Sequence, residues 1–289
     1  MPILTFFQRE SSAEDHDRLI PSTYRDIKNA VLETTTETES FSERYGICKG
    51  IIHYGNNSTV RLHRPSVNEL YAVKVYNRSH PISEVTTYIG LDLRHLHVVK
   101  MNEFLRDKRG YRCLGMEYCA GGDLLSLILS SESGRLEKTE ADCFFKQTVQ
   151  GVGYLHEKGI AHQNLQPESI ALTASGCVKI IDFDRAQSVF APSEFKKKTR
   201  LSVYLSSHQN SSYTAPEEYF RFSQTDHRAS DVWAAGIVYL AMRRGHIFWN
   251  VAQTRCDSRY DEYVKRRSEE SFEPIESLEE VSLGTKTFL

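Results

Sequence analysis

The chain has 289 residues, which is long enough to bury a substantial core in one large domain or in two lobes. Its 38 acidic and 36 basic residues leave a net charge of −2, so neither nucleic acid nor an anionic membrane surface is indicated as a partner. No stretch approaches the roughly 18 apolar residues of a membrane span, and the six scattered cysteines lack zinc-ligand spacing and disulfide density, so we expect a cytoplasmic protein.

The first part of the chain, residues 1–44, is polar and rich in Ser, Thr and Glu, which predicts a flexible N-terminal extension. From Tyr45 the pattern changes to short strands around a turn at Asn56 and Asn57, which predicts an antiparallel meander. The expected strands are at residues 50–52, 59–62, 70–76, 101–104 and 111–117, with a helix at 83–93.

After Gly121 and Gly122 the apolar periodicity becomes helical. A long helix is expected to end at Gly159, with one face formed by Phe145, Val149, Val152 and His156. Residues 169–172 and 178–181 then predict a hairpin that places Asp182 at its end.

The last third of the chain begins with a loop at residues 184–214, whose length suggests a function or disorder. Ser230 can cap an apolar helix that runs from Asp231 to about Met242. Beyond Arg243 the sequence is polar, and no further apolar helix is predicted.

Several short strings occur in a fixed order between residues 50 and 236, and together they resemble the motifs of the protein kinase family. They are Tyr-Ala-Val-Lys at 71–74, Met-Glu-Tyr at 116–118, His-Gln-Asn-Leu-Gln-Pro-Glu-Ser at 162–169, Asp-Phe-Asp at 182–184, Ala-Pro-Glu at 215–217 and Asp-Val-Trp-Ala-Ala-Gly at 231–236. Residues 60–62, 117–124 and 272–278 are similar to those of fungal kinases that regulate salt tolerance and nutrient permeases.

The resemblance implies an α+β, two-lobed fold that uses ATP and Mg²⁺. Residues 45–116 would form a small antiparallel β-rich N-lobe, and residues 117–289 a mainly helical C-lobe that lacks its last helices. It also assigns ATP-binding positions to Gly55, Val60, Ala72, Lys74, Glu117, Cys119 and Asp123, and metal-binding positions to Asp182 and, less well suited, Ser169.

The predicted catalytic loop departs from the family pattern at three positions. Asn164 stands where the family has the aspartate that accepts the proton of the substrate hydroxyl. An amide has no basic lone pair at neutral pH, and loss of a positioned base costs about 10²–10⁴ in rate. Gln166 replaces the lysine that contacts the transferring phosphate, and Ser169 replaces the asparagine that holds a second Mg²⁺.

The nucleotide-binding part of the pattern is also incomplete. Only Gly55 remains of three phosphate-loop glycines, because His53 and Ser58 occupy the other two positions. Thr86 stands where a glutamate would pair with Lys74, and Glu84 lies about 200° away around a helix.

Two further substitutions disfavour nucleotide binding. Asp184 replaces the glycine after Phe183 and brings a negative charge near the phosphates. Ala171 offers a thinner floor for adenine than the larger apolar residue usual in the family. The resemblance therefore implies that ATP binding is weak or absent and that Mg²⁺ could bind through Asp182.

Other residues of the pattern are expected to be structural. His162 would brace the loop by packing, and Asp231 would accept hydrogen bonds from the loop backbone. The resemblance implies that the glutamate at position 217 would pair with an arginine of the family's last helices, which we expect this sequence not to include. We therefore expect that Glu217 has another partner or is exposed, and that some apolar surface is uncovered.

These departures predict a pseudokinase that acts as a binding or regulatory scaffold, with another kinase or a kinase substrate as its protein partner. One alternative is a weakly active ATP-dependent serine/threonine kinase, in which positioning by Lys74 and Asp182 alone supports slow transfer. A second alternative is a decayed kinase fragment that folds poorly.

Overall fold

The computed structural model describes residues 44–67, 69–78, 89–107, 109–188, 211–219 and 226–269. They belong to two compact units, one made of Met1–His80 with Met101–Gly121 and the other of Pro81–Lys100 with Gly122–Leu289. The predicted N-terminal extension, all but the last turn of the predicted helix at 83–93, and most of the loop at 184–214 lie outside the described residues.

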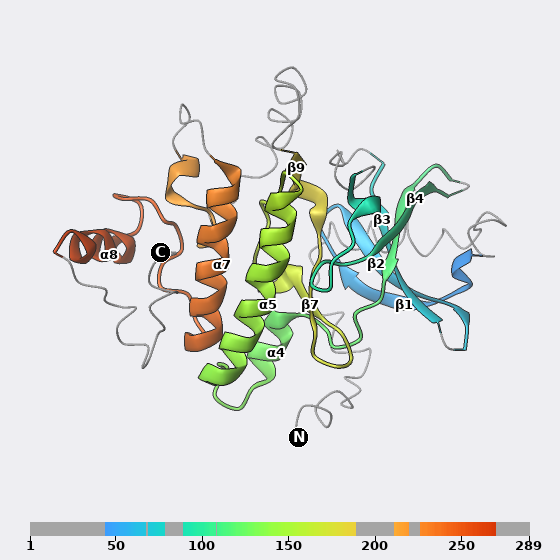
Figure 1. The fold of residues 1–289 in the computed structure, drawn as a ribbon, viewed down its shortest axis with the longest axis horizontal. Helices are drawn as coiled ribbons and strands as arrows, with labels where there is room; N and C mark the ends of the chain where they lie inside the picture. The colour runs from blue at the N-terminus through green and yellow to red at the C-terminus, as the bar shows by residue number, and fades with distance from the viewer. Residues whose placement is uncertain are drawn as a thin grey trace, which may run out of the picture. The chain divides into compact units, whose positions relative to one another are not determined.

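The first unit contains a five-stranded antiparallel sheet (Figure 1), as the meander pattern predicted. In the order of the sheet, its strands are β1 (Ile47–Tyr54), β2 (Ser58–Ser66), β3 (Glu69–Tyr76), β5 (Arg112–Glu117) and β4 (Met101–Arg106). Tyr45, Val73, Val75 and Cys113 form a small core in this unit. The Tyr45 hydroxyl donates to Glu103 Oε1 at 2.7 Å, so the chain just before β1 is tied to β4.

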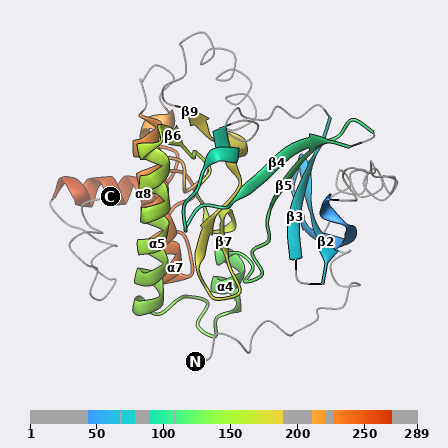
Figure 2. The same ribbon diagram turned by 45° about the vertical axis from the view of Figure 1, so that its right-hand side comes forward.

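The second unit is mainly helical, as predicted. Its helices are α4 (Leu124–Ser130), α5 (Lys138–Glu157), α7 (His227–Arg244) and α8 (Ser258–Ser268). Helices α5 and α7 lie side by side (Figures 1 and 2), and Phe145 of one packs against Tyr239 of the other with ring centroids 4.9 Å apart.

Short strands and 3₁₀ turns of this unit carry the predicted catalytic loop. Strand β6 (Ile160–Ala161) pairs with β9 (Gln187–Ser188), and β7 (Ile170–Leu172) pairs with β8 (Val178–Ile180) in the predicted hairpin. The turns are η3 (Ile89–Asp92), η4 (Pro167–Ser169), η5 (Phe183–Arg185) and η6 (Pro216–Tyr219).

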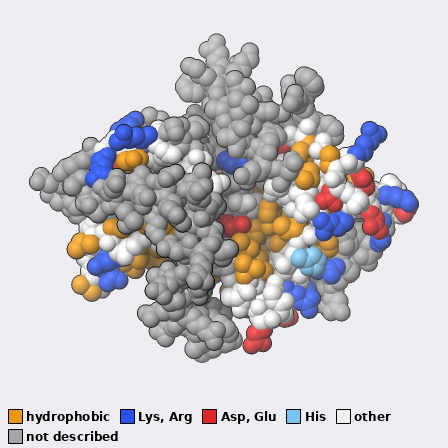
Figure 3. Space-filling model, turned by 180° about the vertical axis from the view of Figure 1, so that it is seen from behind, with side chains coloured by type: hydrophobic (Ala, Val, Ile, Leu, Met, Phe, Trp, Pro, Cys, Tyr) orange, Lys and Arg blue, Asp and Glu red, His pale blue; other side chains and the backbone are white. Residues whose placement is uncertain are grey.

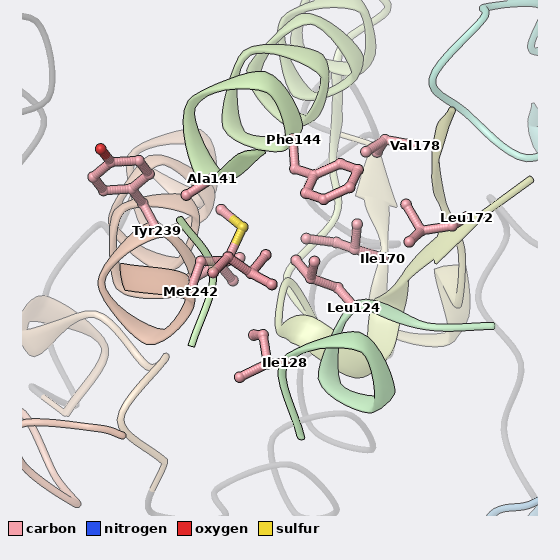
Figure 4. Packing of buried hydrophobic residues seen from close by; sticks show 11 residues of the cluster. Leu124, Ile128, Ala141, Phe144, Ile170, Leu172, Val178, Tyr239 and Met242 are labelled. Carbon is pink, nitrogen blue, oxygen red and sulfur yellow. The ribbon is translucent and has the colours of Figure 1, made fainter. Parts of the chain in front are cut away.

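The main core of the second unit lies between α4, α5, α7 and the β7–β8 hairpin. In Figure 4, side chains from these elements converge on one another, among them Leu124, Phe144, Ile170 and Met242. All of them are buried, so this core fixes the hairpin that precedes Asp182 against the long helices.

Helix α5 ends where the sequence predicted, because Gly159 adopts a left-handed conformation with φ of 70°. Of the predicted face, Val152 is buried, whereas Phe145, Val149 and His156 are only partly buried. Phe144, Thr148 and Leu155 complete the buried face. A Cβ atom at Gly151 would lie 2.7 Å from Ile180 Cδ1 and 2.9 Å from the carbonyl oxygen of His97. A glycine is therefore required here for strand β8 to approach the helix.

Helix α7 begins earlier than predicted. Asp226, not Ser230, is its N-cap, because the Asp226 side chain accepts a hydrogen bond from the backbone N–H of Arg228. Ser230 and Asp231 lie within the helix and are buried. The prediction failed because the first turn is polar, so the apolar pattern starts one turn after the helix does.

Helix α8 was not predicted. Asp257 caps it by accepting from the Arg259 N–H, and it buries Tyr260 and Tyr263 against Trp249. The pattern was missed because both apolar anchors are tyrosines and the other face carries Lys265, Arg266 and Arg267.

The surface agrees with a chain of near-zero net charge. On the face seen in Figure 3, the described basic and acidic side chains lie interspersed. None of the helices within the described residues is long and apolar enough to cross a membrane.

Candidate active site

A buried carboxylate of α7 holds the loop that follows β6. Asp231 Oδ2 accepts from the His162 N–H at 2.7 Å and from His156 Nε2 at 2.9 Å, and its Oδ1 accepts from the Gln163 N–H at 2.7 Å. The residue is 1% exposed, and these donors supply the hydrogen bonds that an ionised buried carboxylate requires. The predicted role of Asp231 as an acceptor for the loop backbone is confirmed.

His162 joins this loop to the segment that contains Asp182. Its Nε2 lies 2.9 Å from the carbonyl oxygen of Ile181, and its Nδ1 accepts from the N–H of Asn164 at 3.3 Å. The ring packs edge-on against Phe183 with centroids 4.9 Å apart. Burial lowers the pKa of His162, which favours the neutral ring that these two bonds require. The predicted structural role of His162 is thus confirmed.

The structure brings Asn164 and Asp182 together. Asn164 Nδ2 donates to Asp182 Oδ2 at 2.8 Å. Asp182 itself has a left-handed backbone, with φ of 65° and ψ of 69°, a conformation that aspartate tolerates better than most residues. The side chain at the predicted base position is therefore a hydrogen-bond donor to the carboxylate at the predicted metal position.

Ser169 turns its hydroxyl toward the loop backbone. Its Oγ lies 2.7 Å from the carbonyl oxygen of Asn164 and 2.9 Å from that of Gln166, and it accepts from the Gln166 N–H at 3.0 Å. The side chain is 1% exposed. Ser169 thus closes the η4 turn. Gln166, which directly precedes this turn, is only partly buried.

The donors present fit one Mg²⁺ at most. Mg²⁺ in such sites uses one or two carboxylates together with phosphate oxygens and water, and Asp182 can supply one carboxylate. The Ser169 hydroxyl is already used within the loop. Among the described residues, no three His, Cys, Asp or Glu side chains are grouped as metal ligands.

Two residues near this loop were missed by the sequence reasoning. Burial raises the pKa of Glu218, while a backbone hydrogen bond from Ala215 and the charge of Arg185 oppose the increase. Arg185 also interacts electrostatically with Asp182. The sequence contains no motif that distinguishes Glu218 from the adjacent Glu217. Only the fold therefore shows that burial acts on Glu218.

Glu217 itself is partly buried. Its charge acts on Tyr260 of α8, whose pKa is raised to about 12 mainly by burial. Glu217 therefore lies near α8, the helix that the sequence did not predict.

In the first unit, Lys74 lies on the central strand β3. It is opposite Val60 of β2 and Leu114 of β5, and it is 8% exposed. Its Nζ lies 5.3 Å from the ring centroid of Tyr76. Ala72, two residues earlier, is buried, whereas Val60 is partly buried. The strand alternation therefore places Lys74 and Ala72 on one face of the sheet, with Val60 beside Lys74.

Gly55 lies in the turn between β1 and β2. Its N–H donates to the carbonyl oxygen of Ser58 at 2.8 Å, and a Cβ atom here would lie 3.2 Å from that oxygen. The remaining phosphate-loop glycine is thus part of a tight turn, with His53 and Ser58 on either side of it.

The other predicted ATP-binding residues lie at the end of β5 or after it in sequence. Glu117 ends β5, and both Glu117 and Cys119 are partly buried in the first unit. Asp123 belongs to the second unit, where it forms a bridge with Ala171 and caps α4 by accepting from the Ser126 N–H at 2.7 Å. Thr86 and Glu84 lie outside the described residues.

Known proteins that are similar to this chain are protein kinases. A model of the protein kinase domain matches residues 49–289. The serine/threonine-protein kinase hal4 of Schizosaccharomyces pombe is 40% identical over 256 residues, which cover 83% of this chain and 39% of that protein. The serine/threonine-protein kinase HAL4/SAT4 of Saccharomyces cerevisiae is 37% identical over 280 residues, 89% of this chain and 45% of that protein.

A third relative, the probable serine/threonine-protein kinase KKQ8 of Saccharomyces cerevisiae, is 30% identical over 282 residues, 85% of this chain and 38% of that protein. The resemblance to fungal kinases is thereby confirmed. The chain spans less than half the length of these curated relatives.

Proposed function

The chain belongs to the protein kinase family, and we propose that within it this chain is a pseudokinase that acts as a binding or regulatory scaffold. The proposal is supported chiefly by Asn164, whose carboxamide stands at the base position and donates to Asp182. Protein kinases act on protein substrates, so the partner is a protein, either another kinase or a kinase substrate.

Proton transfer is the step that this loop supports least. Phosphoryl transfer depends on positioning and charge stabilisation, and the loop carboxylate accepts the proton of the incoming hydroxyl. An amide cannot accept that proton, and the Asn164 amide is directed to Asp182. A loss of about 10²–10⁴ in rate follows from this exchange alone.

Two other substitutions in the loop lower the expected rate of phosphoryl transfer further. Gln166 brings no positive charge to the transferring phosphate, and Ser169 is hydrogen-bonded to loop backbone. Mg²⁺ would neutralise phosphate charge when bound, and Asp182 is the residue that would hold it. ATP binding would rest on Lys74 and on residues Gly55, Val60, Ala72, Glu117, Cys119 and Asp123, and we propose that it is weak.

A second candidate function is that of a slow ATP-dependent serine/threonine kinase. The names of the relatives favour this candidate over an inactive scaffold. Lys74 and Asp182 would then position ATP with one Mg²⁺, and transfer would proceed without a loop base.

Peptide phosphorylation by the purified chain distinguishes the two candidates. A pseudokinase incorporates no more phosphate than its Lys74→Met and Asp182→Ala variants, because the Asn164 amide cannot accept the hydroxyl proton. Measurable transfer that both substitutions abolish would instead establish the slow kinase and refute the scaffold proposal.

Nucleotide binding is tested separately by thermal unfolding with ATP. A ligand at 100 times its dissociation constant stabilises a protein by about 2.7 kcal/mol. We expect a much smaller shift at millimolar ATP, and a large shift would contradict the proposed weak binding. Lys74→Met serves as the control for binding at this site.

A further inference from the structure

Asp182 and Asn164 belong to two segments of the second unit that are joined twice. One connection is the His162 ring, which bonds the carbonyl of Ile181 at one nitrogen and the N–H of Asn164 at the other. The second is the 2.8 Å hydrogen bond from Asn164 Nδ2 to Asp182 Oδ2.

Building on the proposed function, we propose that the Asn164 amide replaces a divalent cation as the partner of Asp182. The loop and the Asp182 segment then keep their arrangement whether or not Mg²⁺ is present. The structure of this site is therefore independent of a cation when no nucleotide is bound.

The hydrogen-bonded backbone of Asn164 fixes the direction in which its side chain leaves the chain. Its N–H is held by His162 Nδ1, and its carbonyl oxygen lies 2.7 Å from Ser169 Oγ. The loop as a whole is fixed by the buried carboxylate of Asp231. With its backbone held on both sides, Asn164 has only its side-chain torsions left to order when the amide donates to Asp182.

The position of Asp182 is also fixed without metal. The next residue, Phe183, is 2% exposed and packs on the His162 ring. Arg185 follows in the same turn and interacts electrostatically with Asp182. A hydrogen-bond donor and a nearby cation therefore already act on this carboxylate.

The identity of residue 164 decides whether a metal is needed. A carboxylate in the same place would bring two anionic oxygens into contact, and like charges at that distance are strongly unfavourable. Unless a cation lay between them, the two side chains, or the segments that carry them, would move apart. An amide of nearly the same shape removes the repulsion and adds a bond.

The test is thermal unfolding of the purified chain with EDTA, with millimolar Mg²⁺ and with millimolar Mn²⁺, in the absence of nucleotide. We expect the same midpoint for the wild-type chain in all three conditions. Asn164→Asp should lower the midpoint in EDTA by roughly 2–4 °C, and either cation should restore part of the loss. The exposed Gln150→Glu exchange on α5 makes the same amide-to-carboxylate change and should show no cation dependence.

The proposal is overturned if the wild-type chain gains as much from the cations as Asn164→Asp does, or if Asn164→Asp is as stable as wild type in EDTA. Should Asn164→Asp fail to fold even with Mn²⁺, Asp182→Ala provides a second test. Its loss of stability should be equal with EDTA and with Mg²⁺, and a loss seen only with Mg²⁺ would refute the proposal.

The cation test and the proposed function can fail separately. None of these measurements contains ATP or a phosphate acceptor, so they report only on the partner of Asp182. Phosphotransfer by the wild-type chain would refute the scaffold function and leave the unfolding results unchanged.

Discussion

The position of the catalytic loop depends on single buried side chains, of which Asp231 is the clearest. It is anchored in α7, and its carboxylate accepts from residues 156, 162 and 163, which come from α5 and the loop. The sequence predicted this role because the string at 231–236 follows the loop in the kinase order. The bond from Asn164 to Asp182 could not be predicted, since it depends on how the His162 ring aligns segments 18 residues apart in sequence.

Removing the Asp231 carboxylate should therefore be costly. Asp231→Ala leaves the backbone N–H groups of the buried His162 and the partly buried Gln163 without their acceptor, and we expect a loss of about 3–5 kcal/mol in the free energy of unfolding. Urea denaturation measures it. Asp226→Ala removes a carboxylate from the exposed N-cap of the same helix and should cost only about 1 kcal/mol. Equal losses in the two variants would contradict the proposed anchoring.

A second buried side chain gives the first unit a pH dependence. His63 is fully buried in β2, and burial lowers its pKa from the usual 6.5 to about 4. Between these values the unfolded chain binds a proton that the folded chain does not. Stability is therefore complete above pH 6.5 and declines as the pH falls toward 4.

The decline attributable to His63 is on the order of 2–3 kcal/mol. Denaturation of His63→Leu at a series of pH values should show a flatter slope between pH 6.5 and 4 than the wild-type chain does. His246→Gln, which changes an exposed histidine, should keep the wild-type slope. An unchanged slope in His63→Leu would exclude this role.

At the scale of elements, the sequence predicted a strand or helix correctly where its apolar pattern is strong, and missed its start or its presence where that pattern is weak. The strands of the sheet and the β7–β8 hairpin were predicted because turn residues separate short β-branched runs. The start of α7 and all of α8 were not, because their cap residues precede polar turns. In α8 the only buried anchors are Tyr260 and Tyr263.

These anchors should carry most of the stability that α8 contributes. Tyr263 packs on Trp249 with ring centroids 4.9 Å apart, and it is 5% exposed. Tyr263→Ala is expected to cost about 3–5 kcal/mol, the range for a buried aromatic side chain. The adjacent Val264, 38% exposed, provides the control, and Val264→Ala should change the free energy of unfolding by less than about 1 kcal/mol.

Tryptophan fluorescence during urea denaturation follows both variants, because Trp233 and Trp249 belong to the same aromatic cluster. If the two substitutions were equally mild, α8 would not be packed on this cluster as the structure has it.

At the scale of the molecule, the α+β fold and the order of its parts were predicted from the motif series, which the match to the protein kinase domain supports. In the described part of the second unit the exposed large apolar side chains are scattered, as on an ordinary protein surface, so the expected uncovered apolar surface stays a prediction. These side chains, Leu96, Leu129, Ile247 and Val264, come from different elements. Aromatic packing by α8 covers Trp249, which is 2% exposed.

This packing bears on whether the chain folds well. A fragment that folds poorly would unfold gradually and with little heat, whereas packed cores in both units predict cooperative transitions. We expect a calorimetric unfolding enthalpy on the order of 100 kcal/mol. A broad transition with a small enthalpy would support the decayed-fragment alternative.

The central claim is that a carboxamide at position 164 prevents proton transfer from an incoming hydroxyl. The most direct measurement is the single-turnover rate of peptide phosphorylation by the wild-type chain beside the Asn164→Asp, Gln166→Lys double variant, with Lys74→Met as background. Our account predicts a wild-type rate at background and a rise of at least about 10² when both groups are restored. A wild-type rate well above background that the double substitution fails to raise would contradict it.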